Sequence, residues 1–314
     1  MKVIKFIAKR LIIMVFTIFI VSYLVFMLLR VGGQDPVNVL LGDKQKVSED
    51  VREALREQYH LNDSLNTQYF IWLQGAVQGD FGVDYVQKQP VADLIGGRVE
   101  VTTGLVIISM IISIVVAIPI GIISALKTNT WIDHILSVLM LIATSIPGFM
   151  AAMLLLIVLS QVMPGYQTVG TYSNFSELLS RLIAPSCCLA LGNIALIGRV
   201  TRNAMVEQMK SDYIMTCNAK GIGQRAIVMK HAFHNSVIPV FTISAMLTGT
   251  VVGASVLVEQ IFSLPGLGNL LSTAVLKSNY PVVQALTLIL LIMFQVIDMI
   301  SDLLYTIIDP RIKL

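Results

Sequence analysis

The amino-acid sequence predicts an all-α membrane protein with six transmembrane helices, and three observations support this fold class. Of its 314 residues, 55% are hydrophobic and only 13% are charged, whereas soluble domains carry about 25% charged residues. Six apolar stretches are each about as long as a helix that crosses a bilayer. Lysine and arginine concentrate in alternate connections between these stretches, which is typical of multi-span membrane proteins.

The predicted spans are apolar and are separated by more polar segments. They cover residues 11–29, 101–126, 134–163, 181–200, 236–258 and 282–306. The first span follows four basic residues and is too long for the core of a signal peptide, so it is predicted to remain uncleaved. Pro147-Gly148 should kink the third span, and the fourth is the weakest candidate because it contains Pro185 and Asn193.

The basic residues also predict the orientation of the chain. If the N-terminus is cytoplasmic, the short outer loops contain only Arg181 and Lys277 as basic residues, and both termini lie inside. The segment 31–98 then lies outside, where its acidic residues outnumber its basic ones. The net charge of +3 therefore reflects topology, and the sequence predicts a lipid bilayer and no nucleic acid as its surroundings.

The segment 31–98 is predicted to form a small extracytoplasmic cap. It is too long for a hairpin loop and too rich in apolar and aromatic residues for a disordered one. Val51, Leu55 and Tyr59 recur every four residues, which predicts a short amphipathic helix with Ser48 as its N-cap.

A second element of the cap is expected around residues 69–73, where tyrosine and tryptophan indicate the membrane interface. Many secondary transporters carry an internal repeat in their sequence, and this sequence shows none. We therefore divide the chain into a first helix with its cytosolic N-terminus (1–30), the cap (31–98) and a five-helix core (99–314).

The core contains a cytosolic segment, residues 205–235, that is predicted to form two short helices meeting at a glycine. Ser211 and Asp212 suit the start of the first helix, because a hydroxyl can cap it and a carboxylate suits its positive end. Lys220 and Gly221 suit its other end, where a basic side chain and a left-handed residue are favoured.

The second helix of this segment is predicted to run from Gln224 to about His234. In the first helix, Tyr213, Ile214 and Cys217 share one apolar face. These features alone are also compatible with a basic cytosolic loop that only satisfies the charge rule for topology.

The order of residues in this segment resembles the coupling segment of the dipeptide/oligopeptide/nickel permeases of ABC importers. That family carries Tyr-x-x-Thr-Ala-x-Ala-Lys-Gly followed by His-Ala, and this chain departs from it at Cys217. The resemblance implies a knob that seats in a groove of an ATPase subunit. We assign to it Tyr213, Thr216, Ala219, Lys220, Gly221, Arg225 and His231.

A second motif, Glu259-Gln-Ile-Phe-Ser-Leu-Pro-Gly-Leu-Gly268, follows the fifth span. Pro265 and the two glycines should end the helix and permit a tight turn. An ordinary interfacial turn would have the same composition, but the family has a closely similar run. The resemblance therefore implies an outer rim of the transport pathway, formed by Glu259, Phe262, Pro265, Gly266 and Gly268.

Asp298 and Asp302 lie one turn apart near the inner end of the sixth span. Acidic residues within a membrane are functional candidates, so we assign them to the pathway. The alternative is a structural ion pair with Arg199 or Arg202, which are expected at the same depth.

Further motifs extend the resemblance over nearly the whole chain. They are Gly79-Asp80-Phe81-Gly82, where Asp84 replaces a serine, Asp35-Pro36, and the ending Asp309-Pro310-Arg311. The resemblance implies the type I ABC-importer permease fold in a bacterial inner membrane. It also implies a homologous second permease, two ABC ATPases that hold ATP and magnesium, and an extracytoplasmic binding protein.

Several classes of function lack their motifs in this sequence. It has no phosphate-binding Gly-x-x-x-x-Gly-Lys-Ser/Thr loop, no His-Glu-x-x-His and no Gly-x-Ser-x-Gly. We therefore expect a transport subunit without enzymatic activity, cofactor or metal site. Di- or oligopeptides are the expected cargo. Nickel or metal chelates, glutathione and opines remain alternatives, and a secondary transporter is a distant one.

Overall fold

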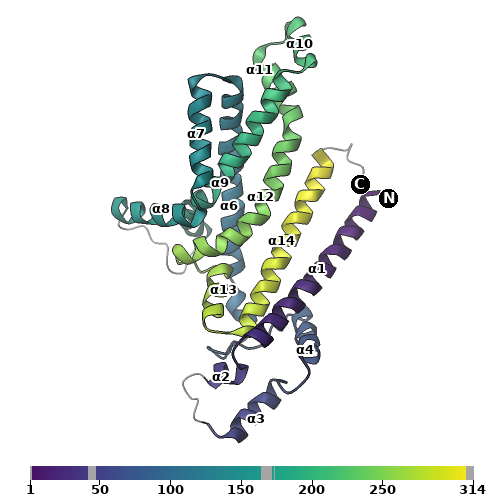
Figure 1. Ribbon diagram of the computed structural model, residues 1–314, viewed down its shortest axis with the longest axis vertical. Coiled ribbons are helices and arrows are strands. Elements are labelled where there is room, and N and C mark those ends of the chain that lie inside the picture. The colour runs from purple at the N-terminus through teal and green to yellow at the C-terminus, as the bar shows by residue number, and fades with distance from the viewer. Residues whose placement is uncertain (1, 42–46, 164–171, 173, 309–314) are drawn as a thin grey trace. The chain divides into compact units, whose positions relative to one another are not determined.

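The computed structural model describes residues 2–41, 47–163, 172 and 174–308 (Figure 1). Within these residues the chain forms helices and no strand, apart from one isolated antiparallel bridge between Val83 and Pro90. The predicted all-α class is confirmed. The C-terminal Asp309-Pro310-Arg311 motif lies outside the described residues.

Among the described residues, five helices are long and apolar enough to cross a membrane. They are α1 (Lys2–Gly32), α6 (Arg98–Leu126), α9 (Phe175–Met209), α12 (Phe233–Ile261) and α14 (Tyr280–Ile308). They contain the first, second, fourth, fifth and sixth predicted spans. Pro119, Pro185 and Pro239 lie inside α6, α9 and α12 without ending them.

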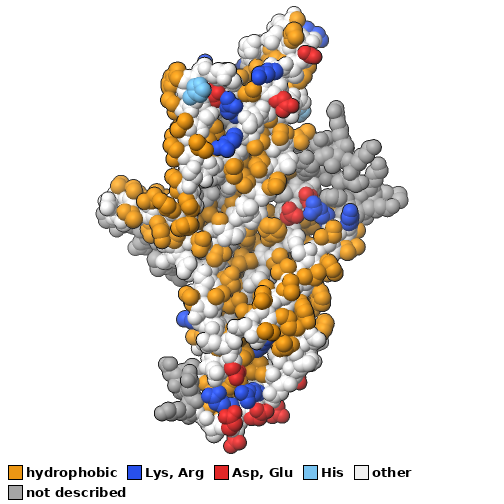
Figure 2. Space-filling model, viewed as in Figure 1, with side chains coloured by type: hydrophobic (Ala, Val, Ile, Leu, Met, Phe, Trp, Pro, Cys, Tyr) orange, Lys and Arg blue, Asp and Glu red, His pale blue; other side chains and the backbone are white. Residues whose placement is uncertain are grey.

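The third predicted span is broken rather than kinked. It forms α7 (Trp131–Ser145) and α8 (Gly148–Val162), which meet at an angle of 98°. Ile146 between them is extended, because the ring of a following proline disfavours helical backbone. Hydrophobic side chains cover α8 at the left of Figure 2. Six spans result only if this bent pair counts as one, so that number stays a prediction.

The part of the cap region that the structure describes contains four short helices. They are α2 (Pro36–Leu41), α3 (Glu49–Gln58), α4 (Leu65–Val77) and α5 (Val91–Ile95). The two helical elements predicted there correspond to α3 and α4. Ser48 precedes α3, but its hydroxyl makes no capping bond, whereas Ser64 accepts a bond from the Thr67 amide at 3.3 Å.

The helices group into two compact units that divide the chain differently from the sequence-based sections. The first unit comprises residues 1–100 and 265–295, and so includes α13 (Leu267–Leu276) and the start of α14. Its buried cluster joins Val91 of α5 to Leu267 and Leu286. Asp84 is buried and accepts a bond from Asn279 Nδ2 at 2.5 Å. The cap is therefore tied to residues near the end of the sequence.

The second unit comprises residues 101–264 and 296–313, and α6, α9 and α12 form its core. Ala117, Ile197 and Val240 connect these three helices in one buried cluster. At Gly121, an added Cβ would lie 2.5 Å from the Thr201 Cβ and 2.6 Å from the Gly198 carbonyl oxygen. The small residues therefore allow α6 and α9 to cross at close range.

Candidate coupling site

A short helix, α10 (Asp212–Ala219), follows the long helix α9. It ends as predicted, because Gly221 adopts a left-handed φ of 71°. The Gly221 amide donates to the Asn218 carbonyl at 3.0 Å, and the Ile222 amide donates to the Cys217 carbonyl at 3.2 Å. These two bonds close the helix end in the pattern that favours glycine. Ser211 precedes α10, but its hydroxyl makes no capping bond to it.

The apolar face of α10 rests on the chain's own core. Ile214 is buried against Met205 of α9 and Ala125 of α6, and Tyr213 and Cys217 pack at the edge of this cluster. The Tyr213 hydroxyl also donates to Gln208 Oε1 at 2.8 Å. The predicted apolar face is therefore used to hold α10 on the second unit, and the other side of α10 faces outward.

The prediction that a second short helix ends near His234 is wrong. The backbone runs from α11 (Gln224–Ala226) through a π-helix (Ile227–Ala232) directly into α12. No glycine or proline interrupts residues 224–238, and the buried side chains of Ile227 and Val228 continue the core. The segment after Gly221 is therefore one helix with the fifth span.

The outward side of this region carries most of the candidate coupling residues. The exposed candidates are Thr216, Ala219, Lys220, Gly221 and Arg225, while Tyr213 and His231 are half-buried. Met215, which sequence reasoning did not select, is 67% exposed on α10. The helical spacing that turns Ile214 inward also turns Met215 and Ala219 outward. The same spacing could therefore have identified Met215 as an exposed residue.

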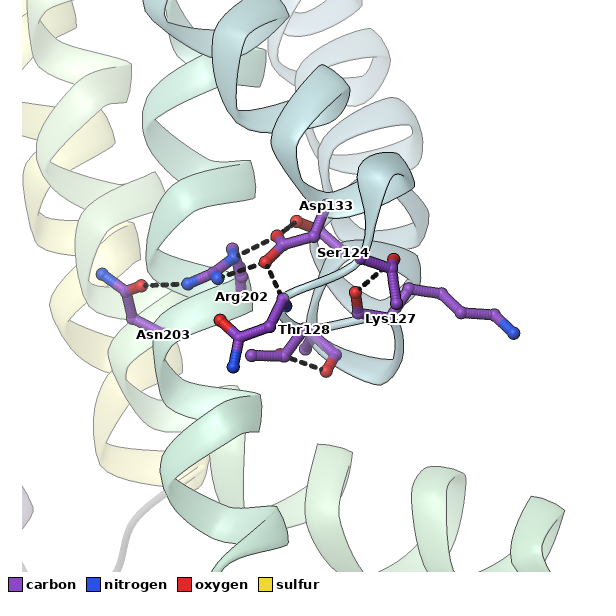
Figure 3. A network of polar contacts seen from close by, with 9 residues as sticks. Ser124, Lys127, Thr128, Asp133, Arg202 and Asn203 are labelled. Atoms are coloured by element: carbon purple, nitrogen blue, oxygen red, sulfur yellow. Dashed lines mark hydrogen bonds and ion pairs between the residues drawn. The ribbon is translucent and has the colours of Figure 1, made fainter.

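A buried ion pair supports the base of this region (Figure 3). Arg202 on α9 donates through Nε to Asp133 Oδ1 and through Nη2 to Asp133 Oδ2, each at 2.6 Å. Ser124 of α6 donates to the same carboxylate at 2.6 Å, and the Asn129 amide donates to it at 3.1 Å. Asp133 is 2% exposed. Two-point contacts of this kind fix geometry as well as charge.

This ion pair fixes the α6–α7 connection to α9, one turn before Met205 in the cluster beneath α10. The alternative prediction that Arg202 forms an ion pair with Asp298 or Asp302 is wrong, because Nε and Nη2 of Arg202 both donate to Asp133. The two aspartates are half-buried on α14, and their pathway role stays a prediction. Asp133 and Arg202 are far apart in sequence, and no motif indicated their contact.

Glu259 and Phe262 are fully buried within the described chain. Thr102 Oγ1 donates to Glu259 Oε1 at 2.7 Å, which links α6 to the end of α12. The helix ends before the proline, because Ser263 adopts a φ of 51° and the Leu264 amide donates to the Glu259 carbonyl at 2.9 Å. The predicted helix end and tight turn are therefore present just before Pro265, with Ser263 rather than a glycine as the left-handed residue of the turn.

The remaining rim candidates follow this turn. Gly266 directly precedes α13, and Gly268 is buried in its first turn. Pro265 is half-buried. The assignment of these residues to a transport pathway stays a prediction. Among the described residues, no group of three histidine, cysteine or acidic side chains could hold a metal ion.

Residues 117–314 match the family described as the inner membrane component of binding-protein-dependent transport systems. This chain belongs to that family. Residues 3–106 match the corresponding N-terminal family of membrane components. The chain is therefore an ABC-importer permease and a multi-pass protein of the inner membrane.

Two relatives cover nearly the whole permease. The oligopeptide transport system permease protein AppB of Bacillus subtilis is 36% identical over 299 residues, which are 93% of this chain and 94% of AppB. The glutathione transport system permease protein GsiC of Escherichia coli K12 is 35% identical over 309 residues, 98% of this chain and 99% of GsiC.

Proposed function

We propose that this permease takes up di- and oligopeptides as one of two homologous permeases in a complex with two ATPases and an extracytoplasmic binding protein. The similarity to AppB over 93% of the chain supports peptide as cargo. The chain contains no phosphate-binding loop, so ATP and magnesium would be held by the partner ATPases. Both termini would lie on the cytoplasmic side, a proposal that the distribution of basic residues supports.

The observation that carries the coupling role is the exposed face of α10. Its inner face is fixed to the second unit by Ile214, while Met215 and Ala219 remain accessible to a partner. The helix is continuous from Gln224 to Ile261, so a force applied to its cytosolic end would be transmitted directly to the fifth span. A movement of α10 would thus reach this helix through the short turn at Gly221 and through the buried cluster that Ile214 shares with Ile227 and Val228.

Glutathione is a second candidate cargo, because GsiC matches 98% of this chain. Glutathione is itself a small peptide, so both candidates need a wide path without a dedicated metal site. The permease complex would be reconstituted in proteoliposomes with its own binding protein, and ATP-driven uptake of labelled peptides and of glutathione would be compared.

We expect uptake of peptides of two to several residues, and excess unlabelled peptide should compete for it. Uptake of glutathione alone would replace the peptide assignment while leaving the permease role intact. A complex that moves neither cargo, although its binding protein stimulates ATP hydrolysis, would contradict both substrate assignments.

A further inference from the structure

The first unit contains a cavity of about 360 Å³ beside the cap helix α4. Residues from the end of α1, from the Gln58–His60 segment, from α4, from the Asp80–Tyr85 segment and from the start of α14 line it. The walls combine aromatic residues, among them Phe26, Tyr59, Phe81 and Tyr280, with polar side chains. The volume falls within the range of pockets that take small ligands.

Four buried polar atoms around this cavity lack a hydrogen-bond partner among the described residues. They are Arg30 Nη1, Trp72 Nε1, Gln284 Nε2 and Gln68 Oε1. Gln68 and Gln284 are 7% and 5% exposed. Buried polar groups are nearly always paired in folded proteins, so four unpaired groups around one cavity indicate a missing polar occupant.

The kind of occupant follows from the balance of these groups. Three of the four are donors, and the strongest is the permanently charged guanidinium of Arg30. The ring of Phe26 lies 5.4 Å from the guanidinium carbon. Tyr85 contacts the same charge: burial raises the pKa of the Tyr85 hydroxyl, and Arg30 opposes that rise. Neither aromatic neighbour supplies an anion to balance Arg30.

One acidic side chain, Asp80, lines the cavity among the described residues. It is exposed, and its Oδ1 accepts a bond from the Gly82 amide at 2.9 Å. It therefore stabilises its own turn.

From these contacts we propose that the cavity binds the oxyanion end of a small ligand, a carboxylate or a phosphate. Arg30, Trp72 and Gln284 donate to the oxyanion after small side-chain rotations, because their free atoms lie buried in the cavity wall. Gln68 accepts from a donor on the ligand, and the aromatic walls cover its apolar part. The oxyanion comes either from a free solute, such as a short peptide, or from the phosphate of an anionic lipid.

The test uses the intrinsic fluorescence of Trp72. The chain contains two tryptophans, and the exposed Trp131 lies outside the cavity lining, so Trp131→Phe leaves Trp72 as the sole reporter. The full chain with this substitution would be placed in phosphatidylcholine nanodiscs. It would then be titrated with dialanine, with dialanine C-terminal amide and with inorganic phosphate.

We expect a saturable change in Trp72 emission with dialanine or inorganic phosphate, and binding of the dialanine amide that is about tenfold weaker or more, since a bond to a charged group is lost. Arg30→Gln should weaken oxyanion binding by a similar factor. Gln284→Leu should weaken it without loss of thermal stability, because it removes a donor that has no partner. Arg52→Gln, which removes a cation of the same cap outside the cavity, should leave binding unchanged.

Replacement of part of the phosphatidylcholine by phosphatidylglycerol identifies the source. If a lipid is the natural occupant, the anionic lipid alone produces the emission change and blocks dialanine. An unchanged emission under all these conditions would overturn the proposal. Equal binding of acid and amide, or an Arg30→Gln variant that binds as the parent does, would also overturn it. None of these outcomes depends on the transported cargo.

Discussion

At the scale of single residues, the Asp133–Arg202 pair joins α7 to α9 near the coupling site through two hydrogen bonds of 2.6 Å. Arg202→Gln leaves the buried Asp133 carboxylate without its cation, and breaking a buried pair in this way costs about 3 kcal/mol. We expect a clearly lower thermal unfolding temperature in detergent. Arg199→Gln is the matched control, because Arg199 lies on the same helix and is exposed.

A variant with both Asp133→Asn and Arg202→Gln should recover part of the loss, because it no longer buries a lone charge. Equal unfolding temperatures for Arg202→Gln and Arg199→Gln would show that the pair does not stabilise this region.

Gly121 tests the close crossing of α6 and α9. Gly121→Ala places a methyl group against Thr201 and the Gly198 carbonyl, so the helices must separate. Such overpacking costs about 1–3 kcal/mol. Gly192→Ala on α9 adds the same methyl where no atom lies within 4 Å and should have little effect on the unfolding temperature. If both variants unfold alike, the close crossing is not needed for stability.

Residue patterns predicted local chemistry better than distant contacts. The left-handed Gly221 and the apolar face with Ile214 followed from spacing, because helix ends and faces are set by near neighbours. The contacts of Asp133 with Arg202 and of Glu259 with Thr102 join residues far apart in sequence. No local pattern encodes such contacts, and they were missed.

At the scale of elements, the length of the apolar stretches predicted where the long helices lie, but not that one stretch would divide into two helices. The run 134–163 is mostly apolar and carries no Asp, Glu, Lys or Arg, yet it divides at Pro147 because Ile146 is extended. In contrast, Pro185 and Pro239 stay within helices. A proline alone therefore does not locate a break, since neighbouring helices determine whether the freed groups are satisfied.

The turn after α10 provides a prediction about an element. Gly221→Pro is incompatible with a φ of 71° and removes the amide that donates to Asn218. The end of α10 should unwind, and transport by the complex should fall at least tenfold while the protein stays in the membrane. Gly223→Ala, at a negative φ and with open space around it, should transport normally. Unchanged uptake by the Gly221→Pro complex would show that this turn is not required for coupling.

At the scale of the whole molecule, we expect ATP hydrolysis to be carried out by other chains. The permease purified alone should release no phosphate from ATP above the background of an empty-membrane preparation. The same permease in the assembled complex should support hydrolysis that the liganded binding protein stimulates. Azide-insensitive ATPase activity of the isolated chain would contradict its role as a transport subunit.

In the proposed mechanism, the outward face of α10 transmits the movement of an ATPase into the membrane. The most direct measurement is ATP-driven peptide uptake by proteoliposomes that contain the complex with Ala219→Glu or Ala219→Ser. Ala219 is exposed, so neither substitution disturbs the packing of α10. We predict that Ala219→Ser transports normally and that Ala219→Glu abolishes uptake, although its complex assembles and docks the binding protein. Normal uptake by the Ala219→Glu complex would contradict the account.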